Sequence, residues 1–264
     1  MADTAVSVAA VAGIVLCCEA ARRGCEWGIR CADYRRFCSE LISTLQLCAC
    51  THELKLLGES GRADPQIGLT LTYLVTVLHV LTFRGALCNP SAALEQLYRG
   101  SLRTLACVAL IACQLGSAWL SRYAALYLWS AGLSEMHLEH RAAGYRCFSP
   151  IHASLPAAAA AEMACAFILQ AVIINIGLFT ESLRVHVIAA TITSLVYAVG
   201  SITGAVMNPA LAFSIQFPCS GHNFLEYAFV FWLGPMLGTA SAVAVFEKII
   251  PFLLKKDSHW KKIQ

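Results

Sequence analysis

The chain alternates between long apolar segments and short polar connections. A bilayer is crossed by about 20 apolar residues in a helix, and six segments reach that length, near 37–57, 67–84, 102–130, 157–179, 185–203 and 224–253. Residues 4–20 form a further apolar segment. No basic stretch precedes it, which disfavours a cleaved signal peptide. It is either an extra transmembrane helix or an interfacial one, and we favour the former.

Two Asn-Pro pairs interrupt this pattern, Asn89-Pro90 in FRGALCNPSAAL and Asn208-Pro209 in GSITGAVMNPALAF. Asn is a preferred helix N-cap and Pro suits the first helical position, so each pair predicts a helix start. The segments that follow, 90–98 and 209–217, are too short to cross a membrane. We therefore predict two re-entrant half-helices, whose backbone must be buried or line a wet cavity.

The two halves of the chain repeat these features. Asn89 and Asn208 lie 119 residues apart, and the intramembrane carboxylates Glu40 and Glu162 lie 122 apart. Each half thus holds three spans and one half-helix, and three is odd, so the second half enters from the opposite face. Interrupted segments at matching positions of an inverted repeat indicate the substrate site.

This pattern divides the chain into five parts. They are an N-terminal apolar helix with a basic linker (1–36), the first repeat (37–133), a polar connection (134–154), the second repeat (155–254) and a basic tail (255–264). Basic flanks favour the cytosolic side, so both ends of the six-span core are expected there. The expected fold class is an all-α membrane protein, an inverted repeat of six transmembrane helices plus two half-helices.

Composition agrees with a polytopic membrane protein. The chain is 58% hydrophobic and 13% charged, against about 25% charged in soluble domains. A net charge of +3 does not suggest a nucleic-acid partner; the expected partner is membrane lipid. Most of the thirteen cysteines lie in apolar runs and behave as small hydrophobes. No nucleophile–base set or phosphate loop is apparent, so we expect no enzyme, no metal and no cofactor.

The predicted half-helices define a candidate pore. Their N-termini meet at the midplane, where Asn89 and Asn208 are expected to donate hydrogen bonds into the pore and the helix dipoles repel cations and protons. The unwound stretches Gly85–Cys88 and Gly204–Met207 would offer carbonyls to water. His79 either lines this pore or bonds, as a neutral His, to a neighbouring helix.

Two glycine pairs, Gly200/Gly204 and Gly234/Gly238, have the small-xxx-small spacing that favours close helix packing.

This arrangement resembles the aquaporin (major intrinsic protein) family. Asn208-Pro209-Ala210 matches the second family motif, whereas Asn89-Pro90-Ser91 differs in its third residue. That difference resembles the unorthodox branch, or superaquaporins, the aquaporin-11 and aquaporin-12 group. Several stretches also resemble this branch: CEAARR, CTHELKLL, SGHNFLEY and WLGP. The first and third are more similar to aquaporin-12 and the second to aquaporin-11, and an aquaporin-12-like member is expected. Cys219 resembles an extra cysteine of the branch.

The resemblance implies a homotetramer with one pore per subunit, in which Glu40 and Glu162 brace the two loops. It also marks departures: Leu211 replaces the usual pore arginine, and Val196 and Leu87 replace two histidines. We therefore expect an apolar constriction that passes water and small neutral solutes such as glycerol. A poorly conducting scaffold protein is the alternative. The pore-lining residues expected are Gly85, Ala86, Leu87, Gly204, Ala205, Val206, Val196, Leu211 and His79.

The C-terminal tail suggests a location within the cell. Lys261 and Lys262 resemble a cytosolic di-lysine retrieval signal for the endoplasmic reticulum membrane, a receptor-read address rather than an anchor. The alternative is an ordinary basic tail.

Overall fold

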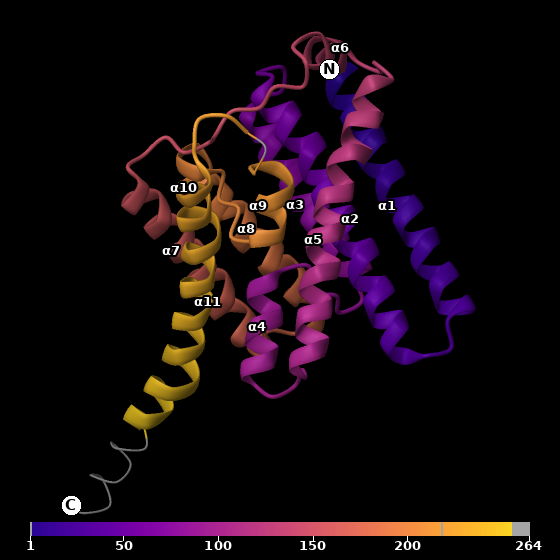
Figure 1. The fold of residues 1–264 in the computed structure, drawn as a ribbon. Helices are drawn as coiled ribbons and strands as arrows, with labels where there is room; N and C mark the ends of the chain where they lie inside the picture. Colours follow the sequence, from indigo (N-terminus) through magenta and orange to yellow (C-terminus); the bar gives the residue numbers. More distant parts are fainter. Residues whose placement is uncertain (1, 218, 255–264) are drawn as a thin grey trace, which may run out of the picture.

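The protein is described here by a computed structural model that covers residues 2–217 and 219–254. Every regular element in these residues is helical (Figure 1). The long helices are α1 (Ala2–Gly28), α2 (Ala32–Glu59), α3 (Pro65–Thr82), α5 (Thr104–Ser130), α7 (Leu155–Ile174) and α8 (Glu181–Thr203). The shorter ones are α4 (Pro90–Tyr98), α6 (Glu135–Ala142), η1 (Ile176–Leu178) and α9 (Pro209–Ile215). A last helix joins α10 (Phe224–Ala228), α11 (Gly234–Ala244) and two π-helical turns, η2 (Phe229–Leu233) and η3 (Val245–Ile249).

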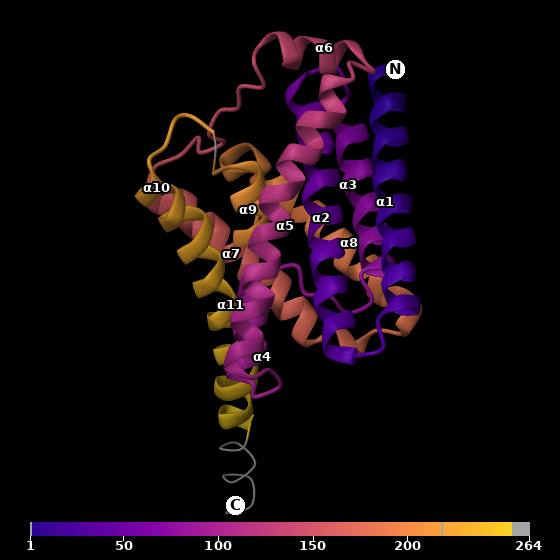
Figure 2. The same ribbon diagram turned by 45° about the vertical axis from the view of Figure 1, so that its right-hand side comes forward.

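The long helices run up and down in one bundle, with α4 in its lower half and α9 in its upper half (Figures 1 and 2). The N-terminal end of α1 and the connection carrying α6 lie at the same end. The last helix ends at the opposite end. Three long helices follow the connection, namely α7, α8 and the last helix. Because this number is odd, the last helix ends on the side opposite the connection.

Six helices in the described residues are long and apolar enough to cross a membrane. They are α1, α3, α5, α7, α8 and the continuous helix Phe224–Leu254. The predicted span 37–57 lies in α2, which has 28 residues but does not belong to this set. Its interior is polar, with Glu40, Gln46, His52 and Glu53 all buried. Helix α2 nevertheless lies within the bundle, packed against α1, α3 and α5.

The N-terminal apolar segment forms α1, which lies alongside α2 (Figure 2). Polar contacts fix both ends of this pair: Ser7 Oγ donates to Glu53 at 2.6 Å, and Arg22 donates to Gln46 at 2.7 Å. Val11 packs with apolar residues of α2 and α3 between them. Buried polar groups are stable only when they are paired, so these contacts bind α1 to the bundle, as the transmembrane alternative requires.

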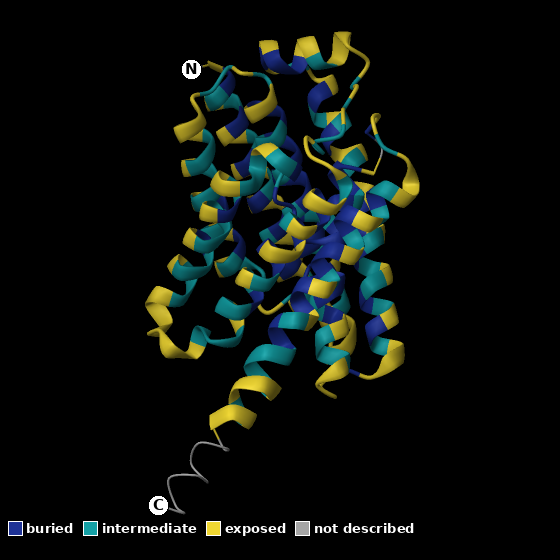
Figure 3. Ribbon diagram, turned by 90° about the vertical axis from the view of Figure 1, so that its left-hand side faces the viewer, coloured by how far each residue is buried: buried dark blue, intermediate teal, exposed yellow. Residues whose placement is uncertain are grey.

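The last helix packs closely against α7 through the glycine pair Gly234 and Gly238. A Cβ atom at Gly234 would lie 2.9 Å from the Ala159 carbonyl oxygen, and one at Gly238 only 2.2 Å from that of Met163. Only glycine permits this approach, so the packing prediction is confirmed here. Figure 3 shows buried positions concentrated in the middle of the bundle.

The same prediction is wrong for Gly200 and Gly204. No atom comes closer than 3.5 Å to a Cβ built at either position. Gly204 instead ends α8 with φ of 86°, in the left-handed region that glycine adopts without strain.

Candidate functional site

Both half-helices begin at the asparagines that the sequence indicated. Asn89 Oδ1 accepts a hydrogen bond from the Ser91 amide at 2.9 Å. Asn208 Oδ1 accepts from the amides of Ala210 at 2.9 Å and Leu211 at 3.3 Å. These bonds satisfy amide groups that have no partner inside the helix, and proline at the next position fixes the first turn.

The two asparagines also join the loops to each other. Asn208 Nδ2 donates to the Cys88 carbonyl at 2.7 Å, and Asn89 Nδ2 donates to the Met207 carbonyl at 3.4 Å. Each amide has two N–H donors, so one per side chain remains. Two of the loop carbonyls expected to accept from water, those of Cys88 and Met207, thus accept from asparagine.

The repeat extends to the backbone of the loops. Gly85 and Gly204 have φ of 85° and 86°, and Cys88 and Met207 have φ of 53° and 54°. The members of each pair lie 119 residues apart. A left-handed conformation is uncommon for residues other than glycine and is retained only where the surroundings enforce it. No sequence signal at Cys88 or Met207 indicated it.

Glu40, from α2, holds the first loop. Its carboxylate is buried and accepts from the amides of Leu87 at 2.9 Å and Cys88 at 2.5 Å. Gln114 Nε2 of α5 donates to the same carboxylate at 2.7 Å. An unwound loop at membrane depth must find partners for its amides within the protein, and Glu40 supplies them.

Glu162, from α7, holds the second loop in the same way. It is fully buried and accepts from the Val206 amide at 3.0 Å and the Met207 amide at 2.7 Å. Its third donor is the Thr203 hydroxyl, at 2.6 Å. The two carboxylates thus bind equivalent amides in the two halves.

The apolar residues expected at the constriction pack in different places. Leu211 packs against Val206 and Ala210, whereas Val196 packs in a cluster with Ala205 and Met207. Leu87 contacts a third cluster, at the base of α4 and α5. No packing cluster of the described residues contains all three side chains.

Three other residues expected to line the pore are Gly85, Ala86 and His79. Gly85 and Ala86 line a pocket at the end of α1. His79 is buried in α3, where its ring stacks on Phe83 with centroids 4.9 Å apart. Its Nε2 has no hydrogen-bond partner among the described residues. Lys261 and Lys262 lie outside the described residues.

Sequence reasoning missed a disulfide between Cys147 and Cys219, whose Cα atoms are 4.7 Å apart. It joins the connection before α7 to the segment after α9. Two signals were available: both cysteines lie outside the apolar runs, and Cys219 resembles an extra cysteine of the unorthodox branch. The amine of Lys55 also holds this region, because it donates to the Ile215 carbonyl, at the last residue of α9, at 3.1 Å.

Comparisons with known proteins agree with this geometry. Residues 30–246 match the family model described as Major intrinsic protein. The chain is 42% identical to aquaporin-11 of Equus caballus (86% of this chain, 82% of the relative) and 36% identical to that of Homo sapiens (98% and 95%). It is 31% identical to aquaporin-12 of Mus musculus (99% and 92%). Identity is thus higher with these aquaporin-11 sequences than with that aquaporin-12.

A solved structure shows the same fold. The aquaglyceroporin from Plasmodium falciparum superposes with a TM-score of 0.68 at 18% identity, over 85% of this chain and 99% of that one. The matched region begins at residue 30, which leaves α1 outside it. The chain is a multi-pass membrane protein that belongs to the major intrinsic protein family of channels, in the group of aquaporin-11 and aquaporin-12.

Proposed function

We propose that this protein is an intracellular membrane channel for passive transport of water and small neutral solutes such as glycerol. The observation that carries the proposal is the reciprocal pairing of the two loops. Each half-helix starts at an asparagine that also donates to the other loop's carbonyl, Asn208 to Cys88 and Asn89 to Met207.

The proposed pore runs past this junction. One N–H of each asparagine remains to donate to a passing oxygen. The N-termini of α4 and α9 contribute partial positive charge, which opposes cations and protons. The carboxylates of Glu40 and Glu162 hold the loops from behind, so that the remaining carbonyls of Gly85–Leu87 and Gly204–Val206 are available as water acceptors.

Selectivity is proposed to follow from Leu211. An arginine there would add a fixed charge and five donors to the pore, and leucine adds neither. An apolar lining admits neutral solutes and slows water by dewetting. Leu211 is half-buried, so a polar replacement can still reach open space.

The test compares wild type with Leu211→Arg in liposomes of equal protein content. Glycerol flux should fall in the variant by a larger factor than water flux. Leu211→Met is the matched control because it keeps volume and apolarity, and it should retain the wild-type ratio. Equal glycerol flux in wild type and Leu211→Arg would show that Leu211 does not set solute access.

A scaffold protein with little conduction is the second candidate. The apolar residues Leu211 and Val196, at positions where the family usually carries arginine and histidine, favour it, because an apolar constriction closes a pore to water by dewetting. Glycerol and water flux no higher than in empty liposomes would select this candidate.

Assembly and location are part of the proposal. A homotetramer follows from the family, and cross-linking of the purified protein in its lipid tests it. The endoplasmic reticulum membrane is the proposed location, supported by Lys261 and Lys262. Exchange of both lysines for serine should then change the distribution within the cell.

A further inference from the structure

A pocket of about 480 Å³ lies between the end of α1, the start of α2 and the first re-entrant loop. Helix α1 contributes Arg22 and Glu26, helix α2 contributes Arg35 and Arg36, and the loop contributes Arg84. Four of the five charged residues that line the pocket are therefore arginines.

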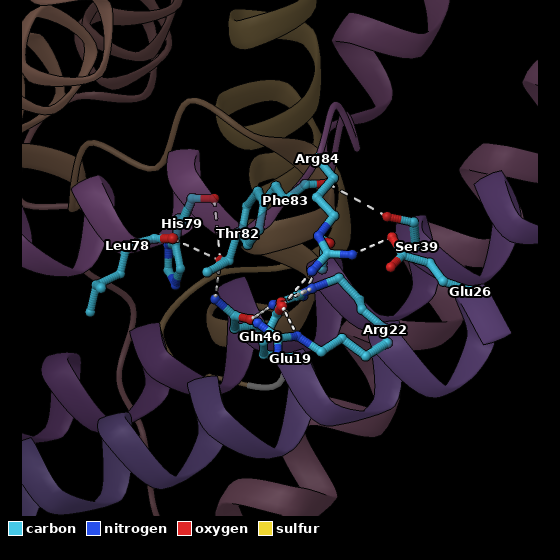
Figure 4. Close-up of polar contacts among 12 residues, drawn as sticks. Glu19, Arg22, Glu26, Ser39, Gln46, Leu78, His79, Thr82, Phe83 and Arg84 are labelled. Carbon is cyan, nitrogen blue, oxygen red and sulfur yellow. Dashed lines mark hydrogen bonds and ion pairs between the residues drawn. The ribbon is translucent and has the colours of Figure 1, made fainter. Parts of the chain in front are cut away.

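Two of these arginines are already neutralised. The guanidinium of Arg22 is buried and bonded to Glu19 at 3.2 Å and to Gln46 at 2.7 Å. Arg84 pairs with both Glu19 and Glu26, as Figure 4 shows. The carboxylates of Glu19 and Glu26 are therefore already paired with arginines that line the pocket.

The other two arginines keep their charge available. Arg36 bonds to the neutral side chain of Gln96 at 3.0 Å, and Arg35 forms no ion pair within the described residues. Both are exposed at the start of α2. The N-cap of α2, Cys31, forms no side-chain capping bond, so amides of the first turn have no side-chain cap. The same turn carries the carboxylate of Asp33, which does not line the pocket.

The size and the charge of the pocket narrow the choice of ligand. Arginine is suited to bidentate recognition of phosphate, and open helix N-termini bind phosphate as well. The volume falls in the range of small-molecule sites, and it is larger than a single phosphate needs. The basic linker that forms the rim marks the cytosolic side of the membrane, where basic pockets between helices bind anionic headgroups.

We propose that this pocket binds a phosphorylated polyol headgroup, held by Arg35 and Arg36. The source of that headgroup is either a membrane phosphoinositide or a free polyol phosphate. The inference goes beyond the proposed function and does not depend on permeation, because binding is measured without flux.

The test measures equilibrium binding to the full-length protein in nanodiscs of phosphatidylcholine. One probe is a phosphoinositide added to the nanodisc lipid, and the other is soluble inositol trisphosphate. Loss of one arginine contact at a membrane surface weakens binding about fivefold, so Arg35→Gln/Arg36→Gln should lose roughly 25-fold. Arg30→Gln is the matched control, since Arg30 belongs to the same exposed linker and does not line the pocket.

The possible results distinguish a lipid headgroup from a free polyol phosphate, and both from a pocket that binds neither. Binding of both probes that only the double variant weakens supports the headgroup site. Binding of the lipid alone assigns a membrane source, and binding of the soluble probe alone assigns a free polyol phosphate. Binding of neither probe overturns the proposal. Unchanged binding in the double variant also overturns it, as does a loss in Arg30→Gln as large as that of the double variant. Both arginines are exposed, so the variants should fold, which size-exclusion chromatography verifies.

Discussion

Replacement of Glu162 tests whether one carboxylate holds the second re-entrant loop. In Glu162→Ala the amides of Val206 and Met207 lose their acceptor. The Thr203 hydroxyl loses the same acceptor, but a helical threonine can donate instead to a carbonyl of the preceding turn. A stranded buried donor costs about 1–3 kcal/mol, so the variant should lose about 2–6 kcal/mol. Glu162→Gln keeps one oxygen and strands a single amide, so its loss should be about half as large, roughly 1–3 kcal/mol.

Unfolding in mixed micelles, followed by tryptophan fluorescence as the fraction of denaturing detergent rises, gives these free energies. Hydrogen exchange at Val206 and Met207 adds a local readout, which should accelerate in the order wild type, Gln, Ala. Glu181→Ala, at an exposed position, is the control and should stay within about 0.5 kcal/mol. Equal stability of wild type and both Glu162 variants would refute the bracing argument.

Three further predictions concern other parts of the bundle. Gly238→Ala should destabilise by about 1–3 kcal/mol through overpacking, whereas Gly200→Ala should be neutral or stabilise by up to about 1 kcal/mol; thermal denaturation of the two side by side checks this contrast. Ser91→Ala should stabilise by roughly 1–2 kcal/mol, because the Ser91 hydroxyl is buried without a partner in the described residues; a lower denaturation midpoint would contradict it. Cys219→Ser should lose about 2–4 kcal/mol by removing the bond to Cys147, and a reductant should bring wild type to the same midpoint while leaving the variant unchanged.

The half-helices could be predicted from sequence because their determinants are local. Asn-Pro combines an N-cap with a residue that suits the first helical turn, and the 119-residue spacing between Asn89 and Asn208 carries the repeat. The pairing of Asn208 with the Cys88 carbonyl could not be predicted, because it depends on how two loops far apart in the chain meet.

Sequence reasoning failed where the spacing of residues along the chain was the only evidence for a contact in space. Gly234/Gly238 and Gly200/Gly204 share one spacing, yet only the first pair faces a helix backbone. Which side of a helix meets a neighbour depends on the whole bundle. The disulfide of Cys147 was missed for the same reason, because its partner lies 72 residues away.

The polarity of α2 has a consequence for biogenesis. Charged residues oppose insertion of a helix by the translocon, most strongly at its centre, and α2 carries Glu40 and Glu53, both buried in the folded protein. Helix α1 emerges from the ribosome first and brings Ser7 and Arg22, the partners of Glu53 and Gln46. We therefore expect the two helices to leave the translocon together as a hairpin. Helix α1 then supplies polar partners to α2, which would partition poorly into lipid by itself.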